Sequence, residues 1–454
     1  MPELMNEKRA FLNDHAAELR PQLDVNEKRQ LDDLGSTNTV TQDRLLERFE
    51  TKLYTFSKAE GEYDEGAKNV LMTVSDPGPS IALFPILQKL TQDRHCRSLS
   101  LLCDGVAGQA FEKNPDLSKS FHSVRTDGQP LLGDIKTVVE KFPPDVILNS
   151  FTTRGGPERL TLFSGKTILG SPKAKSYYIF EGWVPPDLSK KNIETLDGVF
   201  CNDELAKSLL LAKNPQLEAE HIYTTGTAQL DDIDYPHADE YHARGREKLE
   251  IPNDEFAFLF LANPQSDFPA TAQTSEGEIR LVDNVPLRTW EKTLHALSQF
   301  AQTQPNKKFH CICRPHPRDA NPTSYFEIAQ QTSLPVNVRV VDGSRTRCTI
   351  NEATYAADII ASFLSTETFK AQRRGKRGVF LFYDDEPGLG GDAAYAFFDP
   401  ASLEAIQKNP TTNVVRTEAE CALAIQRVLE EPPPDRPNAV GVDSSQKILD
   451  IIFG

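Results

Sequence analysis

The chain has 454 residues, more than one hydrophobic core usually serves, and its apolar content suffices for two domains. Its formal net charge of −16 at pH 7 argues against a general nucleic-acid or anionic-membrane binder, because both functions need a basic surface. No apolar run approaches the roughly 20 residues of a membrane-spanning helix, and the amino terminus lacks the apolar core of a signal peptide. We therefore expect a soluble, cytoplasmic protein of two domains.

The seven cysteines are scattered along the chain, mostly within apolar, strand-like segments. None of them forms a Cys-x-x-Cys pair and their number is odd, so neither a zinc site nor a disulfide framework is expected. We expect reduced thiols in the core, no bound metal and no cofactor.

Residues 1–67 are rich in charged residues and leucine. The second part of this segment has apolar residues at a spacing that predicts an amphipathic helix: Leu45, Leu46, Phe49, Leu53 and Phe56. We interpret residues 1–67 as a helical extension of the first domain, and its amphipathic surface as a candidate contact for a partner.

Residues 68–235 are predicted to form the first α/β domain. Short apolar strands alternate there with turns and helical segments, which implies a mostly parallel sheet covered on both faces. Strands are expected at 69–74, 99–103, 145–148, 177–180 and 198–201. The turn after the first strand lacks the G-x-G-x-x-G pattern of dinucleotide-binding proteins.

Asp76 is the first candidate for a catalytic base, because it lies in the turn that follows the first strand. Glu158 and Glu181 are alternatives in the same domain. A carboxylate in such a turn also commonly caps a helix, so the sequence leaves the identity of the base open.

The first domain ends in residues 223–234, YTTGTAQLDDID. This stretch resembles one found at the same point in nucleotide-sugar 2-epimerases and many GT-B enzymes, which implies that Gly226 lies near the crossing between domains. The acidic run from Asp231 to Asp234 mimics a D-x-D metal motif, but its position after a whole domain favours a helix N-terminal or linker role. Residues 236–254 are expected to be a polar linker.

The second domain, residues 255–430, opens with an apolar strand at 256–261. Asn263 and Gln265 follow this strand, where GT-B enzymes commonly have a loop that faces the donor phosphates. The long polar segment 266–283 is expected to be an excursion from the domain.

A short buried strand later in this domain ends in Arg314-Pro315-His316-Pro317-Arg318. The carboxyl ends of parallel strands form the ligand edge of an open α/β sheet. The prolines fix the backbone and leave few N–H donors, so the arginines and the imidazole are the candidate ligand contacts. This combination favours a phosphate or nucleotide over an apolar ligand.

A hydroxyl-rich turn follows the predicted strand 358–361. Ser365 or Thr366 is expected to cap the next helix, with Glu367 in its first turn. Free backbone N–H groups beside hydroxyls form a favourable place for an anion. An ordinary helix cap would have much the same sequence.

Together, the two motifs and their order resemble the carboxyl-terminal domain of GT-B glycosyltransferases, particularly bacterial sialyl- and Kdo-transferases and CDP-glycerol glycerophosphotransferases. In those families a His-Pro motif contacts the nucleotide and a Ser/Thr motif its phosphate; His316-Pro317 and Ser365-Thr366 match them here. The resemblance implies two Rossmann-like domains facing a cleft, and a donor that is cytidine-linked. The candidate donor-binding residues are Asn263, Gln265, Arg314, His316, Pro317, Arg318, Ser365, Thr366 and Glu367.

Residues 431–454 begin with a proline-rich break and end in a predicted helix at 444–452. GT-B proteins often return such a helix to the first domain, which this arrangement resembles.

The main functional prediction is a glycosyltransferase that moves a sugar from a nucleotide donor to the hydroxyl of a carbohydrate or glycolipid acceptor, in the synthesis of surface polysaccharide or glycoconjugates. Two alternatives stay open: a nucleotide-sugar 2-epimerase, which would need carboxylates for proton removal, and a GT-B-derived binding protein without catalysis. Transfer is expected to need no metal, although Asp384, Asp385 and Glu386 follow a core strand and could hold Mg²⁺.

Overall fold

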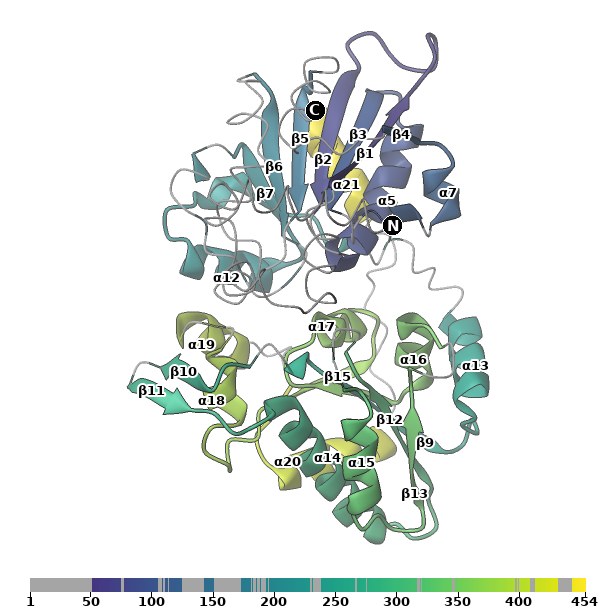
Figure 1. The fold of residues 1–454 in the computed structure, drawn as a ribbon, viewed down its shortest axis with the longest axis vertical. Helices are drawn as coiled ribbons and strands as arrows, with labels where there is room; N and C mark the ends of the chain where they lie inside the picture. The colour runs from purple at the N-terminus through teal and green to yellow at the C-terminus, as the bar shows by residue number, and fades with distance from the viewer. Residues whose placement is uncertain are drawn as a thin grey trace, which may run out of the picture. The chain divides into compact units, whose positions relative to one another are not determined.

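The fold comes from a computed structural model of the chain (Figure 1). The structure describes residues 51–74, 77–104, 108, 111–112, 114–124, 143–150, 173–180, 182, 185, 188, 193–194, 196–228, 231, 238–265, 268–274, 276–316, 319, 321–344, 348–396, 398, 400–408, 413–431 and 443–454. The chain divides into two units, a first unit of Met1–Asp232 with Asp443–Gly454 and a second unit of Ile233–Val442.

The first unit contains an eight-stranded sheet in the order β4-β1-β3-β2-β5-β6-β7-β8. The six strands from β3 to β8 in this order are parallel, whereas β1 runs antiparallel to both of its neighbours. The strands are β1 (Thr51–Ser57), β2 (Lys68–Val74), β3 (Cys96–Asp104), β4 (His122–Val124), β5 (Val146–Ser150), β6 (Lys175–Phe180), β7 (Gly198–Cys201) and β8 (Ile222–Thr224). The helices are α5 (Pro77–Gln92), α7 (Pro115–Ser118), α12 (Glu204–Lys213), the 3-10 turn η3 (Ala219–His221) and α21 (Ser444–Phe453).

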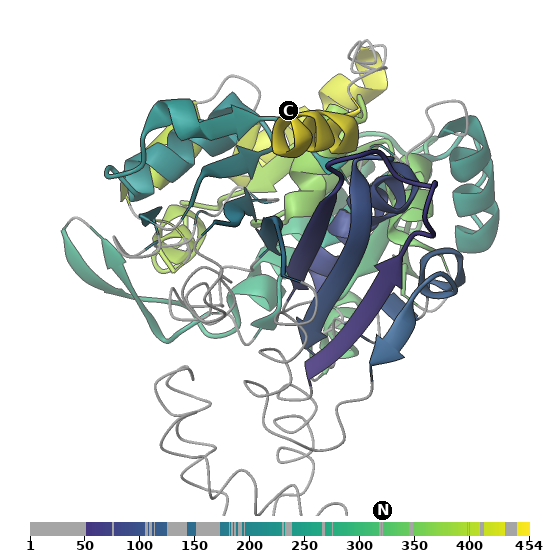
Figure 2. The same cartoon turned by 90° about the horizontal axis from the view of Figure 1, so that it is seen from above.

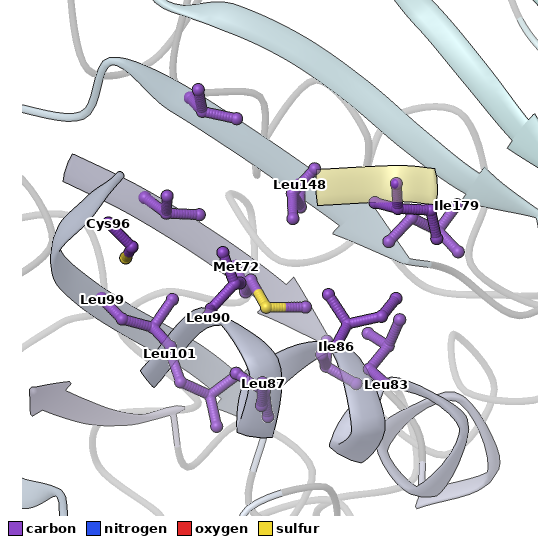
Figure 3. Close-up of a cluster of buried hydrophobic side chains, with 14 of the residues drawn as sticks. Met72, Leu83, Ile86, Leu87, Leu90, Cys96, Leu99, Leu101, Leu148 and Ile179 are labelled. Atoms are coloured by element: carbon purple, nitrogen blue, oxygen red, sulfur yellow. The ribbon is translucent and has the colours of Figure 1, made fainter. Parts of the chain in front are cut away.

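The core of this unit forms where α5 and α21 pack on the sheet. Met72 and Leu148, which are paired on neighbouring strands, belong to the same buried cluster as Leu87 of α5 (Figure 3). All three side chains are at most 1% exposed. Burial of a large aliphatic side chain stabilises the folded state by about 1.5–3 kcal/mol. This apolar layer therefore holds the first sheet and its carboxyl edge in place.

The strand β1 shows that one sequence prediction was wrong. Residues 51–57 were expected to continue an amphipathic helix through Leu53 and Phe56, but they pair with β3 over seven residues. A three-residue spacing fits a helix, yet the aromatic and β-branched residues of this segment favour a strand, and pairing on both sides decides the outcome. Leu45, Leu46 and Phe49 lie outside the described residues.

The terminal helix α21 belongs to the first unit, and Figure 2 shows it in yellow beside that unit's strands. Its N-cap is Asp443, whose side chain accepts from the N–H of Gln446 at 2.8 Å, and the carboxylate of Asp231 also accepts hydrogen bonds from the backbone N–H groups of Ser444 (2.9 Å) and Ser445 (2.6 Å). The other end is held by Lys68, whose Nζ donates to the carbonyl of Ile452 at 3.0 Å. Of the acidic run, for which the sequence favoured a helix N-terminal or linker role, Asp231 thus binds the N-terminus of a helix that is remote in sequence, and residues 232–234 lie outside the described residues.

The second unit contains a six-stranded parallel sheet in the order β13-β12-β9-β14-β15-β16. Its strands are β9 (Phe256–Leu261), β12 (Phe309–Arg314), β13 (Val338–Asp342), β14 (Ile359–Ser362), β15 (Arg377–Leu381) and β16 (Val414–Val415). Its helices are α13 (Ala238–Leu249), α14 (Val285–Gln302), α15 (Ser324–Gln331), α16 (Ile350–Ala356), α17 (Thr366–Arg373), α18 (Gly390–Ala394), α19 (Pro400–Lys408) and α20 (Glu418–Glu430). Numbered by chain order, this is the 3-2-1-4-5-6 arrangement of doubly wound folds, whose ligand crevice lies where the order reverses.

Two segments of the second unit differ from the sequence prediction. The expected polar linker at 236–254 is largely the helix α13, which packs so closely on α16 that a β-carbon at Gly245 would collide with the carbonyl oxygen of Glu352. The expected polar excursion at 266–283 contains the hairpin of β10 (Thr271–Thr274) and β11 (Gly277–Arg280), next to α18 in Figure 1.

All seven cysteines are buried free thiols, as the sequence predicted. Within the described residues, we find no helix with the length and apolar character needed to cross a bilayer.

Candidate functional site

The carboxyl edge of the second sheet is where the sequence motifs meet. The crevice of a 3-2-1-4-5-6 sheet lies between the first and fourth strands, here β9 and β14. Asn263 follows β9 and its side chain bonds to the backbone of Leu364, which follows β14. The amide Nδ2 donates to the carbonyl oxygen of Leu364 at 3.2 Å, and Oδ1 accepts from its N–H at 3.1 Å. Asn263 thus ties the two loops of the crevice together.

The His316 loop is held in the same way by a carboxylate. Asp319 accepts hydrogen bonds from the backbone N–H of Gln265 at 2.8 Å and from that of His316 at 3.3 Å. It therefore joins the loop after β9 to the loop after β12. Sequence reasoning did not single out Asp319; its spacing of three residues from His316 was the available signal. Pro317 and Arg318 lie outside the described residues.

Arg314 ends β12 and its guanidinium points into the protein. Its Nη1 donates to the carbonyl oxygens of Gly343 (3.0 Å) and Cys348 (2.9 Å), so it fixes the loop after β13. Burial lowers the pKa of Arg314, but an arginine side chain stays charged in proteins. Arg314 therefore places a fixed positive charge beneath the edge.

The hydroxyl-rich turn is the N-cap of α17, as the sequence predicted. The Ser365 hydroxyl accepts from the N–H of Glu367 at 3.3 Å, and the N–H of Ser365 donates to the Ser362 hydroxyl at 3.0 Å. The Ser362 hydroxyl also bonds to that of Thr368, at 2.7 Å. Thr366, the first helical residue, is exposed. The turn is thus rigid, with one exposed hydroxyl at the helix N-terminus.

Glu367 lies in positive surroundings. Its carboxylate contacts Lys370 Nζ at 2.9 Å and Arg374 Nη1 at 3.9 Å. Burial raises the pKa of Glu367, but the charges of Lys370, Arg374 and Arg314 outweigh this effect and hold the pKa below its ordinary value. The carboxylate of Glu367 is therefore ionised, and the three cations leave the surroundings of this residue with a net positive charge.

The three candidate bases of the first domain, Asp76, Glu158 and Glu181, lie outside the described residues. The strand that leads to Asp76 is nevertheless well placed. In chain order, the parallel strands of the first sheet read 2-1-3-4-5-6, which reverses between β2 and β5. The last residue of β2, Val74, is paired with Ser150, the last residue of β5. The described strand β2 thus ends at that sheet's own reversal point, two residues before Asp76 in the sequence.

The acidic residues after β15 are engaged by cations. Asp385 pairs with Lys292 at 3.1 Å, and Glu386 pairs with Arg288 at 3.0 Å. Asp384 pairs with Arg416. Among the residues that the structure describes, no group of three or more metal-ligating side chains is gathered for an ion. The feature that argued for Mg²⁺ is therefore a set of ion pairs.

No protein-family model matches the chain, and comparison with curated proteins finds no significant relative. Solved structures do resemble it. A UDP-GlcNAc 2-epimerase from Neisseria meningitidis, solved with UDP-GlcNAc, has a TM-score of 0.55 and 14% identity, and covers 85% of this chain and 99% of its own. The enzyme of that name from Methanocaldococcus jannaschii has a TM-score of 0.54, 13% identity and the same coverage. The S. aureus protein MnaA, solved with UDP, has a TM-score of 0.51, 13% identity and coverages of 85% and 96%.

The comparisons confirm the predicted fold, an α/β protein of the GT-B type with two parallel-sheet domains. They contradict the main functional prediction: the similar structures are 2-epimerases, which are isomerases, so glycosyltransferase was the wrong enzyme class. The resemblance to CMP-sugar transferases is not confirmed either. The error arose because a His-Pro loop and a capped helix at a sheet edge suit any nucleotide-sugar enzyme of this fold, and fold alone does not set the reaction.

Proposed function

We propose that the protein binds a nucleotide-activated sugar and inverts the configuration at carbon 2 of that sugar, as a nucleotide-sugar 2-epimerase. The observation that carries the proposal is the carboxyl edge of the second sheet, where Asn263 and Asp319 hold three loops together and Lys370 and Arg374 place positive charge beside Glu367. The similar structures named for 2-epimerase activity, one of them with UDP-GlcNAc bound, support a UDP-sugar as the substrate.

In this proposal the loops after β12 and β14 bind the nucleotide and its phosphates. His316 and the exposed Thr366 are the direct contacts, with Ser365 supplying the capped helix start. A helix N-terminus and nearby cations favour the negative charge of a diphosphate. Asn263 and Asp319 act indirectly, because their polar atoms are used to hold the loops.

Gln265, Arg314 and Glu367 complete the proposed nucleotide-binding set, together with Pro317 and Arg318. Gln265 uses its backbone N–H on Asp319 and its side-chain amide on Ser324 (3.3 Å). Arg314 contributes charge while its Nη1 stays bonded to main-chain carbonyls. Glu367 orients Lys370.

Inversion at carbon 2 removes a hydrogen from one face of the sugar and returns one to the other, so it needs at least one acid–base group. We propose a carboxylate of the first unit for this role. Asp76 comes first among the candidates, because it follows β2 by two residues in the sequence and β2 ends at the reversal point of that sheet; Glu181 and Glu158 follow. The described carboxylates at the edge of the second sheet are less suitable as the acid–base group, since Asp319 is hydrogen-bonded to backbone N–H groups and Glu367 is paired with a cation.

The test is incubation of the full chain with UDP-N-acetylglucosamine in D₂O, without any acceptor, followed by proton NMR. We expect the 2-epimer to appear and deuterium to enter at carbon 2 of the sugar. Asp76→Asn, Glu181→Gln and Glu158→Gln then identify the base as the variant that loses exchange but still binds UDP.

The absence of both epimerisation and exchange, in a protein that UDP stabilises against heat, would overturn the catalytic part. It would leave the second candidate, a nucleotide-binding protein without catalysis, which is favoured by the engagement of Asp319 and Glu367 in structural contacts. A ligand at 100 times its dissociation constant stabilises a protein by about 2.7 kcal/mol, so binding would be visible in a thermal-shift panel of UDP, CMP, CDP, GDP and ADP.

A further inference from the structure

The first unit has a cavity of its own at the carboxyl ends of β6, β7 and β8. Its free space is about 300 Å³, including the mouth that opens to solvent. Apolar side chains form most of the wall, among them Leu83 and Ile179, both labelled in Figure 3, and Ile448 of α21. The space between the side chains is narrow, so it takes a group of about the size of a water molecule or a hydroxyl.

Two threonines give this cavity an unusual wall. Thr225 and Thr227 line it on either side of Gly226, and they are 2% and 4% exposed. The Oγ1 atoms of both have no hydrogen-bond partner among the described residues. Burial of a hydroxyl without a partner is unfavourable, and native proteins keep few such groups. Two of them in one narrow cavity point to a guest that bonds to both.

The backbone holds these hydroxyls in place. The N–H of Thr225 donates to the carbonyl of Cys201 at 3.0 Å, which continues the pairing of β7 with β8. Gly226 has a φ of +100°, a conformation open to glycine and strained for other residues. The backbone conformation after β8 is therefore defined, and it sets the positions of both threonines.

The wall is also uncharged. All of the described residues that line the cavity are neutral, and Asn202 is the remaining polar one, with its Nδ2 donating to the carbonyl of Gly182 at 3.4 Å. Burial raises the pKa of the lining thiol Cys201 to about 12, so this group stays protonated. A phosphate or carboxylate would lose its hydration without gaining a cation, whereas a neutral hydroxyl loses little.

We propose that the cavity lined by Thr225 and Thr227 receives one hydroxyl group of an uncharged, polyhydroxylated ligand, and that this ligand is the sugar part of the nucleotide sugar. The inference rests on the proposed function for the identity of the sugar. It adds a second recognition element, in the first unit, which binds the sugar and does not affect the affinity for the nucleotide.

The experiment measures the affinities of UDP and UDP-N-acetylglucosamine by calorimetry for the wild type and for Thr225→Val with Thr227→Val. We expect the double variant to bind UDP unchanged and to bind UDP-N-acetylglucosamine about thirtyfold more weakly, a change that corresponds to about 2 kcal/mol for the two lost hydrogen bonds. Its melting temperature without ligand should not fall, because valine keeps the volume and removes an unpaired polar atom.

Thr73→Val is the matched control. Thr73 is 1% exposed in the same unit, but its hydroxyl donates to Asn149 at 2.8 Å, so this variant should melt earlier and keep the ratio of the two affinities. Thr225→Ser with Thr227→Ser keeps the hydroxyls and should keep the ratio as well. If the double valine variant does not fold, the two single valine variants are measured instead.

Equal affinity for UDP-N-acetylglucosamine in the wild type and the valine variants would overturn the inference and leave an internal water as the only occupant, with UDP binding and the proposed function intact. Failure of the wild type to bind either ligand would overturn both the inference and the proposed function.

Discussion

The two sheets have carboxyl edges of opposite character. At the edge of the second sheet, the side chains of Asn263, Asp319 and Ser365 are hydrogen-bonded to backbone groups of the loops and of the helix start. Glu367 is paired with the cation of Lys370. At the β6 to β8 edge of the first sheet, the buried hydroxyls of Thr225 and Thr227 have no partner among the described residues and line an uncharged cavity.

This difference teaches which edge is preorganised. Where loops are already held by hydrogen bonds, their conformational entropy is lost during folding and not during binding. Such a site binds a charged group without rearrangement. A site with unpaired hydroxyls is stabilised only when a ligand or a water fills it. Substitutions of Asn263 and Asp319, which hold the loops of the second edge, should therefore affect folding and binding together, whereas substitutions of Thr225 and Thr227 at the first edge should affect binding alone.

Asn263→Ala should have the largest effect. It leaves both the N–H and the carbonyl of Leu364 unpaired at a position where Asn263 is 9% exposed, so we expect the unfolding free energy to fall by roughly 2–4 kcal/mol. Urea denaturation measures this change. Asn321→Ala is the control, because Asn321 is exposed, and it should change the free energy by less than about 0.5 kcal/mol. Equal losses in the two variants would show that the Asn263 bridge does not hold the crevice.

Asp319→Ala comes next. It frees the loops after β9 and β12, so we expect a loss of about 1–3 kcal/mol in stability and about tenfold weaker UDP binding. The control is Asp342→Ala, since Asp342 Oδ1 accepts from the backbone N–H and the hydroxyl of the exposed Ser344, away from the Gln265 and His316 backbone. Calorimetry compares the affinities of the two variants for UDP. An unchanged affinity in Asp319→Ala would remove Asp319 from the proposed site.

His316→Ala and Ser365→Ala should weaken UDP binding without unfolding the protein. Ser365→Ala also removes an N-cap, which costs about 1 kcal/mol, so it should melt slightly earlier. Ser344→Ala, in an exposed turn of the same unit, is the control. Full UDP affinity in both variants would separate the two motifs from nucleotide binding.

Much of the fold could be predicted from local sequence. Strands such as β2, β9 and β12 are apolar runs bounded by turns, and a parallel sheet buried on both faces requires this pattern. The strand β1 could not be predicted, because spacings that suit a helix face also occur in a short strand, and its partner β3 is remote in sequence. The charged helix α13 was likewise hidden, since it is stabilised by packing against α16.

The site was predictable only where its signal is local. His316 and Ser365 follow strands directly, so the pattern placed them at the edge. The contact of Asp319 with Gln265 joins loops far apart in sequence, and no local rule indicates it. The reaction was not predictable from these residues, because the candidate carboxylates lie in the first unit and one fold serves several reactions.

The smallest expected effect is a pH dependence that differs between the units. His310, 5% exposed at the amino end region of β12, contacts Glu255 through Nε2, and Arg339 Nε donates to its Nδ1 at 3.1 Å. Burial lowers the pKa of His310 and the charge of Arg339 adds to this, while Glu255 offsets part of it. The unfolded chain therefore takes up a proton near pH 6.5 that the folded unit does not, so stability falls as the pH drops through 6.5 toward the folded pKa.

The first unit has the opposite tendency at Asp231, where burial raises the pKa of the carboxyl despite its bonds to α21. That contribution is present at low pH and is lost as the pH rises through the folded pKa. We expect hydrogen exchange between pH 7.5 and 5.5 to show a loss of protection in β12 and β13 that exceeds any loss in α21. His310→Gln, which removes the titrating group, should flatten the profile of the second unit alone. A profile that is the same in this variant as in the wild type would assign the pH dependence to other groups.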